Sequence, residues 1–154
     1  MTRLPLARDL ARDLAILVTR LGVGLVFVAH GWQKLNYSGL DRTAESFARL
    51  GVPAPQLSAF YATFVELLGG AALIAGLAVP VAGVLLALDM AGAFLFVHGG
   101  NGLFVSDGGF ELVLALGTAC LLLAVVGAGR FGLDHVVRGR RSGTHNAQRA
   151  RAGG

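Results

Sequence analysis

The sequence predicts an all-α membrane protein, a bundle of four transmembrane helices. Of its 154 residues, 55% are hydrophobic and only 14% are charged, which is too apolar for an ordinary soluble domain. The charged residues leave four apolar runs free, each close to the ~20 residues that a helix needs to cross hydrocarbon. A soluble bundle, the alternative, would show polar and apolar faces at the helical period, whereas these runs are apolar all round. We expect the helices at about 14–33, 57–78, 80–98 and 109–128.

The segments outside these runs are more polar. Residues 1–13 form an N-terminal segment, the four-helix membrane domain spans 14–137, and 138–154 is a basic tail that we expect to be disordered and attracted to anionic lipid head groups. In the first connection, "LNYSGLDRTAESFARLGVPAPQ", apolar and charged residues occupy different helical faces, which predicts a short helix on the outer membrane surface. The alternative is a covering loop without a role in ligand binding. Pro80 suits the first turn of the third helix and predicts a tight hairpin between the second and third helices.

Arginine residues set the expected orientation. Lysine and arginine near helix ends are retained in the cytoplasm. Three arginines precede the first helix and six follow the fourth, so both termini should be cytoplasmic; they are Arg3, Arg8, Arg12, Arg130, Arg138, Arg140, Arg141, Arg149 and Arg151. No nucleic-acid reading module accompanies the basic tail, so the bilayer rather than nucleic acid is the expected partner.

Three ionisable residues lie at membrane depth: Arg20, Glu66 and Asp89. Arg20 shares a helical stripe with Gly24 and Gly31, and both acids share faces with small residues, which let membrane helices approach closely. We therefore expect a buried cluster of all three, in which one cation against two acids leaves a net negative charge or one bound proton. The cluster is either a polar staple or a proton-handling or ligand-contacting site. The alternative for Arg20 is snorkelling to the cytoplasmic head groups.

A second polar layer is expected toward the outer face, where an alternating topology brings the ends of the first and third helices together with the start of the fourth. Its histidines allow three readings: interfacial residues, hydrogen-bonding groups for a quinone-like or other polar head group, or axial ligands to a haem or metal. No spacing motif such as H-x3-H is present, so no metal site is predicted and haem is disfavoured. The candidate ligand-binding residues are His30, Lys34, Thr63, His98, Asn101 and Glu111; Thr63 would either bridge the two layers or bond its own helix backbone.

The sequence lacks the residues that several other kinds of active site require. Cys120 is the single cysteine and lies deep in the fourth helix, so an intramolecular disulfide or dithiol site cannot form. Neither a Walker-type phosphate loop nor a serine nucleophile elbow is present.

Four motifs together resemble one known family. They are "HGWQK" at the end of the first helix, "ELLGGAALIAG" in the second, Asp89 in the third, and "GAGRFGLD" at residues 127–134 after the fourth. This layout, with Arg20 in the first helix, is similar to that of the DoxX family of small bacterial four-helix membrane proteins, over roughly residues 14–137. Gly132 stands where relatives often have serine. From the residues alone, Arg130 complements the dipole of the fourth helix and is expected to pair with Asp134 at the cytoplasmic surface.

The resemblance implies a redox role in the bacterial plasma (inner) membrane. DoxX-like proteins are associated with a thiosulfate-quinone oxidoreductase and, in mycobacteria, with a membrane complex containing a superoxide dismutase and a sulfurtransferase that resists oxidative and thiol stress. By analogy the chain is expected to be a membrane subunit of such a complex, facing a quinone and meeting soluble redox enzymes of these kinds. Whether it is itself an enzyme stays open; if so, it would be an oxidoreductase subunit acting with partners. The alternatives are a non-catalytic binder or transporter of a small hydrophobic or acidic molecule, and a membrane scaffold for soluble enzymes.

Overall fold

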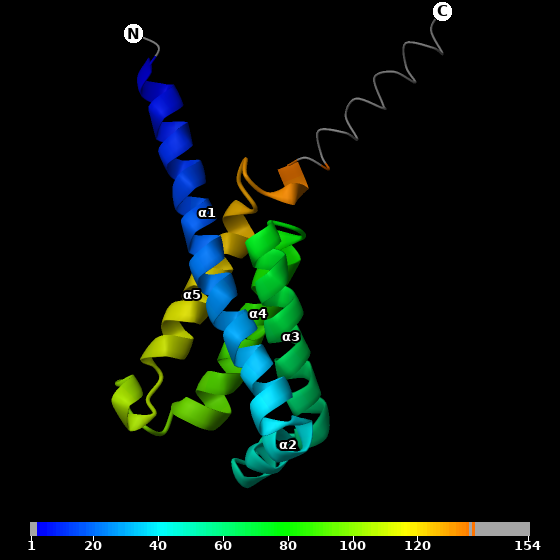
Figure 1. Ribbon diagram of the computed structural model, residues 1–154. Helices are drawn as coiled ribbons and strands as arrows, with labels where there is room; N and C mark the ends of the chain where they lie inside the picture. Colours follow the sequence, from blue (N-terminus) through cyan, green and yellow to red (C-terminus); the bar gives the residue numbers. More distant parts are fainter. Residues whose placement is uncertain (1–2, 136, 138–154) are drawn as a thin grey trace, which may run out of the picture.

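The computed structural model describes residues 3–135 and 137, and within this part of the chain it contains helices and no strand. Four long helices run up and down the molecule (Figure 1). They are α1 (Arg3–Trp32), α3 (Pro55–Ala75), α4 (Val79–Ala93) and α5 (Glu111–Val126). Shorter elements connect or extend them: the π-helical turns η1 (Gln33–Ser38) and η2 (Phe94–His98), helix α2 (Leu40–Arg49), and the 3-10 turn η3 (Val105–Asp107).

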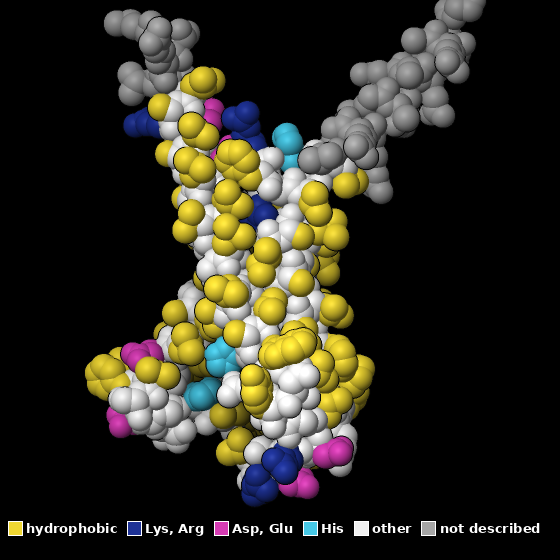
Figure 2. All heavy atoms as spheres, in the orientation of Figure 1, with side chains coloured by type: hydrophobic (Ala, Val, Ile, Leu, Met, Phe, Trp, Pro, Cys, Tyr) yellow, Lys and Arg dark blue, Asp and Glu magenta, His cyan; other side chains and the backbone are white. Residues whose placement is uncertain are grey.

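Three of the helical segments are long and apolar enough to cross a membrane. They are Leu6–Ser38, Pro55–Ala75 and Val79–His98, the first and last including the π-helical turns. Helix α5 is equally apolar but has only 16 residues. Charged side chains gather mainly toward the two ends of the molecule, and apolar side chains cover the middle (Figure 2). The predicted all-helical membrane architecture is therefore confirmed, while the cytoplasmic location of both termini stays a prediction.

The first helix begins well before the predicted boundary. It starts at Arg3 rather than near residue 14, and Pro5 falls in its first turn, where a missing N–H breaks no helical bond. Residue 14 therefore marks a change in polarity and not the end of a helix. Helix α2 occupies the connection in which a short helix was predicted. The predicted basic tail, residues 138–154, lies outside the described residues.

Glycines allow α1 and α3 to cross in backbone contact. A Cβ built on Gly24 would lie 2.7 Å from the Gly70 carbonyl oxygen, and one on Gly70 would lie 2.7 Å from that of Gly24. Helices α4 and α5 meet in the same way, because a Cβ on Gly83 would lie 2.7 Å from the Cys120 carbonyl oxygen. The small-residue stripe predicted on the first helix is thus a packing surface.

Arg20 holds together the end of the bundle where α1 begins, and it pairs with neither acid. Its side chain is 1% exposed; Nε donates to the Leu73 carbonyl at 2.8 Å, Nη2 to the Ile74 carbonyl at 3.0 Å, and Nη1 to the Ala128 carbonyl. These oxygens belong to the last turn of α3 and the segment after α5, where helix carbonyls lack intrahelical partners and carry partial negative charge. The expected Arg20 cluster with Glu66 and Asp89 is therefore wrong, and so is snorkelling. Glu66 precedes Ile74 by two turns of α3, ~12 Å along the axis.

Asp134 closes the same end of the bundle. Its Oδ1 accepts from the Ala78 N–H at 2.8 Å and its Oδ2 from the Val79 N–H at 3.1 Å, so it caps the positive N-terminus of α4. The Asp134 N–H in turn donates to the Gly76 carbonyl at 2.9 Å. The predicted pairing of Asp134 with Arg130 is therefore wrong: Arg130 Nε lies 3.8 Å from Asp13 Oδ2. We call the contacts of Arg20 and Asp134 the clasp.

The clasp leaves no room for side chains at two glycines. Gly76 has a φ of 69°, which favours glycine, and a Cβ there would collide with the Arg20 guanidinium and with Gly132. A Cβ on Gly132 would collide with Ala128 and lie 3.0 Å from the Gly76 carbonyl oxygen. The "GAGRFGLD" stretch therefore follows α5 and packs against the C-terminal end of α3, the N-terminal end of α4 and the Asp13–Arg20 part of α1.

Replacing Arg20 with lysine tests the clasp. An ammonium keeps the charge but cannot reach carbonyls on two helix ends with the fork of a guanidinium, so we expect the free energy of unfolding to fall by about 1.5–3 kcal/mol. SDS titration in mixed micelles would measure this. The exposed Arg12→Lys on the same helix is the matched control and should change stability by less than about 0.5 kcal/mol. Equal effects of the two substitutions would contradict the clasp.

Candidate ligand-binding site

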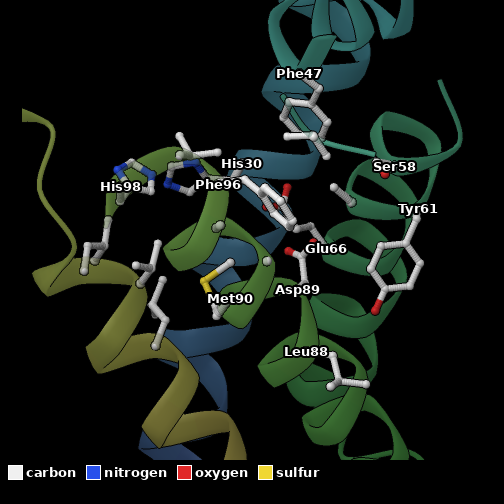
Figure 3. A pocket seen from close by; sticks show the side chains of 18 of the residues that line it. His30, Phe47, Ser58, Tyr61, Glu66, Leu88, Asp89, Met90, Phe96 and His98 are labelled. Carbon is white, nitrogen blue, oxygen red and sulfur yellow. The ribbon is translucent and has the colours of Figure 1, made fainter. Parts of the chain in front are cut away.

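A cavity of about 520 Å³ opens in the half of the bundle opposite the clasp. Its walls come from α1 and η1, from α2 and the loop after it, and from α3, α4, η2 and α5 (Figure 3). Most of the lining is apolar, including Phe27, Met90, Phe96, Leu112 and Leu116. The polar lining residues are His30, Lys34, Ser58, Tyr61, Glu66, Asp89 and His98. The cavity thus brings residues of both predicted polar layers into one site.

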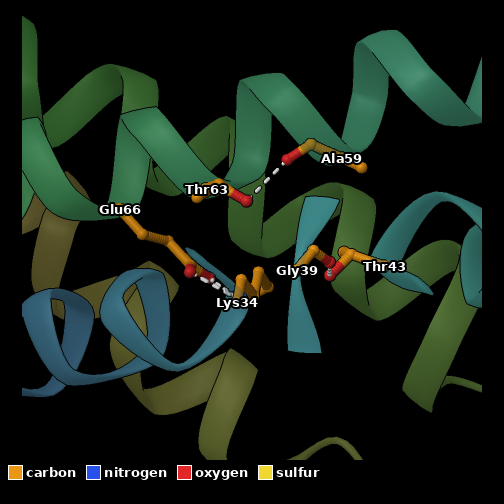
Figure 4. Close-up of polar contacts among 6 residues, drawn as sticks. All are labelled: Lys34, Gly39, Thr43, Ala59, Thr63 and Glu66. Atoms are coloured by element: carbon orange, nitrogen blue, oxygen red, sulfur yellow. Dashed lines mark hydrogen bonds and ion pairs between the residues drawn. The ribbon is translucent and has the colours of Figure 1, made fainter. Parts of the chain in front are cut away.

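A buried ion pair between Lys34 and Glu66 forms the first polar group of the cavity. Lys34 Nζ lies 2.6 Å from Glu66 Oε2 and 2.8 Å from Oε1 (Figure 4). The Glu66 side chain is 5% exposed and that of Lys34 is 22% exposed, so the pair is largely screened from water. Removing Lys34 would leave the buried Glu66 carboxylate without its partner.

The sequence contains a signal for this pair. The stripe of Arg20, Gly24 and Gly31 continues to Lys34, fourteen residues or about four helical turns after Arg20. A cation therefore stands at each end of the surface that packs on α3. Lys34 contacts the Glu66 carboxylate, while Arg20 contacts helix carbonyls.

Asp89 brings a second carboxylate to the same wall. It comes from α4, is 9% exposed, and points toward Glu66 inside the cavity (Figure 3). The cation of this group is the Lys34 ammonium, which contacts Glu66, instead of the expected Arg20 guanidinium. The charge count is unchanged: the three groups hold a net negative charge or one bound proton.

The two histidines line the cavity from the ends of different helices. His30 is an exposed residue of α1, and His98 is a half-buried residue at the end of η2. Histidine side chains are visible in the hollow between α2 and the loop that precedes α5 (Figure 2). His98 Nδ1 lies 2.7 Å from the Gly108 carbonyl oxygen. Among the described residues, no three His, Cys, Asp or Glu side chains are grouped so that they could hold a metal ion.

Three predicted candidates lie outside the cavity lining and hold local structure. Thr63 donates to the Ala59 carbonyl of its own helix at 2.7 Å, which was the alternative considered for it (Figure 4). Asn101 Nδ2 donates to the carbonyls of Val97 and Gly108 at 3.2 and 3.3 Å. Glu111 Oε1 accepts from the Val105 N–H at 2.8 Å. The last two contacts brace the loop that carries Gly108.

Sequence reasoning missed Tyr61 and Phe47. Tyr61 lies on α3 and its hydroxyl donates to the Leu85 carbonyl at 3.1 Å, while Phe47 reaches the cavity from α2. Both look like interfacial aromatic residues in the sequence, because such residues are common at membrane boundaries. Only the folding of α2 over the end of the bundle brings Phe47 to the site.

A separate polar groove of about 540 Å³ adjoins the cavity at Lys34. Its lining comes from η1 and α2 and is Lys34, Tyr37, Ser38, Arg42, Thr43, Glu45, Ser46 and Arg49. Lys34 lines both spaces. The ion pair therefore stands between an apolar cavity and a hydrophilic surface.

Double-mutant cycles distinguish the observed ion pair from the predicted one. Lys34→Met and Glu66→Gln should each lower the free energy of unfolding, and their combination should deviate from the sum by about 1–3 kcal/mol. Arg20→Lys and Glu66→Gln should be additive within about 0.5 kcal/mol, because these residues share no contact. SDS unfolding of the six proteins, including the wild type, measures both cycles. Coupling in the second cycle and additivity in the first would contradict the structure.

Comparison with known proteins places the chain in a family. The family model DoxX matches residues 15–99. The Bacillus subtilis protein named "Putative oxidoreductase CatD" is 30% identical over 88% of this chain and 96% of its own length. The inner membrane protein YphA of Escherichia coli is 29% identical over 80% of this chain and 91% of its own, and an uncharacterized membrane protein of Mycobacterium tuberculosis is 34% identical over 78% and 79%. No solved structure matches the chain.

These matches agree with the apolar helices of the structure, and the chain is a multi-pass protein of the bacterial plasma (inner) membrane. The match over residues 15–99 and the near full-length likeness to the Bacillus protein show that this chain belongs to the DoxX family.

Proposed function

We propose that this chain is the membrane subunit of a redox complex and that its cavity holds the ring of a lipid-soluble quinone. The observation that carries this proposal is a mostly apolar cavity with Lys34, Glu66 and Asp89 in its lining. Cavities of about 300–1,000 Å³ with mostly apolar lining and a few placed polar groups are typical small-molecule sites. At about 520 Å³ this cavity has the size for a substituted aromatic ring.

The charged wall suits the chemistry of a quinone. Reduction takes up two electrons and two protons, Q + 2e⁻ + 2H⁺ → QH₂, and oxidation releases them. A bound proton shared by Glu66 and Asp89 is available to a quinone oxygen, and the Lys34 ammonium stabilises negative charge that develops there. Protons exchange with water through the polar groove that Lys34 also lines. The electrons pass to or from a soluble redox enzyme, in agreement with the oxidoreductase name of the Bacillus relative.

A second candidate function is binding or transport of a small acidic amphiphile. The observation that favours it is the position of Lys34 between the apolar cavity and a groove that also holds Arg42 and Arg49. An anionic head group would bind these cations while its tail occupied the cavity. The third candidate, a scaffold for soluble enzymes, depends on residues 138–154, and deletion of this tail would test it.

Filling the cavity should abolish quinone binding. A Cβ at Gly92, which lines the cavity, meets no atom within 4 Å, so Gly92→Phe can fold and place its ring in the space. Gly22→Phe is the matched control, because Gly22 is equally open but lies on the exposed surface of α1. We expect decylubiquinone at 100 times its Kd to stabilise the wild type and Gly22→Phe by about 2.7 kcal/mol and to leave Gly92→Phe unchanged. Equal stabilisation of all three would place the quinone elsewhere.

Two probes with the same tail separate the first two functions. Decylubiquinone and decanoate both carry a ten-carbon chain but differ in their head groups. A quinone site should bind decylubiquinone at least about tenfold more tightly, a difference of ~1.4 kcal/mol. Thermal shifts and calorimetry in detergent measure both affinities. If decanoate binds more tightly, and Glu66→Gln strengthens its binding by releasing Lys34, the acidic-amphiphile function replaces the proposed one. Asp9→Asn is the control, because Asp9 is an exposed residue of α1 that lines neither the cavity nor the groove.

A further inference from the structure

The hydrogen bond of His98 fixes which of its ring nitrogens carries the proton. Nδ1 lies 2.7 Å from the Gly108 carbonyl oxygen, and a carbonyl oxygen can only accept. The hydrogen must therefore be on Nδ1. In the neutral imidazole this leaves Nε2 as a bare acceptor, and no described residue donates to it.

The loop around Gly108 is built to hold that carbonyl in place. Gly108 has a φ of 78°, and its N–H donates to the Val105 carbonyl at 3.0 Å. Asn101 binds the same Gly108 oxygen at 3.3 Å, and Glu111 holds the Val105 N–H at 2.8 Å. Asn101 and Glu111 are thus positioning residues that act on His98 through the loop.

The cavity consequently presents hydrogen-bond acceptors from separate helices. His98 lines it from the end of η2, and Glu66 and Asp89 line it from α3 and α4 (Figure 3). A quinone ring carries two carbonyl oxygens, which only accept hydrogen bonds. A hydroquinone carries two hydroxyl groups at opposite ends of its ring, and each can donate. On the wall of Glu66 and Asp89 the Lys34 ammonium and the shared proton can also donate, so this wall can pair with either redox form. The bare Nε2 of His98 pairs only with a hydroxyl group and therefore favours the reduced form.

We propose that the cavity selects the hydroquinone over the quinone, and that His98 determines this selectivity by accepting a hydrogen bond from one hydroxyl group at Nε2. This inference rests on the proposed function and adds to it the redox form of the ligand. One hydrogen bond gained by the reduced form corresponds to roughly a tenfold difference in affinity.

Two substitutions separate the two nitrogens of His98. The NH2 group of asparagine reaches the position of Nδ1, so His98→Asn can keep the bond to Gly108 but places no acceptor at the position of Nε2. The longer glutamine reaches the position of Nε2, so His98→Gln presents a carbonyl oxygen to the cavity but gives up the loop bond. His135→Asn, an exposed residue near the clasp, is the matched control.

The measurement is the ratio of the Kd values for decylubiquinone and decylubiquinol, the latter under anaerobic conditions. We expect a ratio of about ten for the wild type and His135→Asn, about one for His98→Asn, and an intermediate or wild-type value for His98→Gln. In His98→Asn the affinity for the oxidised form should not change, which a merely structural role of His98 would not predict.

Nitrogen-15 NMR of ring-labelled histidine, without any ligand, supplies an independent readout. We expect one imidazole with a protonated Nδ1 and an unprotonated Nε2, and this signal should disappear in His98→Asn. A protonated Nε2, equal wild-type affinities for the two forms, or an unchanged ratio in His98→Asn would each overturn the inference. Absence of binding by both forms would instead refute the proposed function itself, so the two failures are distinguishable.

Discussion

Hydrocarbon offers no hydrogen bonds, so every polar group inside this bundle must find its partner within the protein. That constraint determines both ends of the molecule. At one end Arg20 supplies donors to carbonyls of α3 and of the segment after α5, and Asp134 supplies acceptors to the first N–H groups of α4. At the other end Lys34 and Glu66 satisfy each other. Each charge is held because its removal would leave a buried polar group unpaired.

The two ends differ in how closely they pack, and this difference creates the cavity. At the clasp, neither Gly76 nor Gly132 leaves space for a Cβ. The end of α3 is therefore in direct contact with the segment 127–134 that follows α5. Along α1 and α3 the contact continues through Gly24 and Gly70. The contact continues past this crossing at Gly31, where a Cβ would lie 2.9 Å from the Thr63 carbonyl oxygen. The cavity lies beside this contact and is lined by side chains from α1, α3, α4 and α5 and from η1, α2 and η2. The closely packed end of the bundle thus fixes the positions of the helices that surround the cavity at the other end.

The residues of the open end form two groups with different roles. Lys34, Glu66, Asp89 and His98 face the cavity and can exchange hydrogen bonds or protons with a ligand. Asn101 and Glu111 face the loop and fix the carbonyl that orients His98. A site keeps its geometry when its polar side chains are carried by helices. Here the side chain that depends on a loop, His98, is held by the contacts of that loop.

The sequence by itself determined the apolar helices, the approximate depth of each polar residue along its helix and the helix face on which it lies. It could do so because hydropathy and a 3.6-residue period are local properties. It therefore placed Arg20 on an inward face, with snorkelling as the alternative, and it indicated the glycine stripe and most of the ionisable residues that line the cavity. Only the tertiary structure decided the partners: carbonyls for Arg20, Glu66 for Lys34, and the α4 N-terminus for Asp134. Partner choice depends on how far one helix is shifted along another, and about two turns, ~12 Å, separate the last turn of α3 from the mid-helix carboxylate of Glu66. The relative shift of the helices is set by the glycine contact between Gly24 and Gly70 together with residues 127–134. No local sequence pattern encodes this shift.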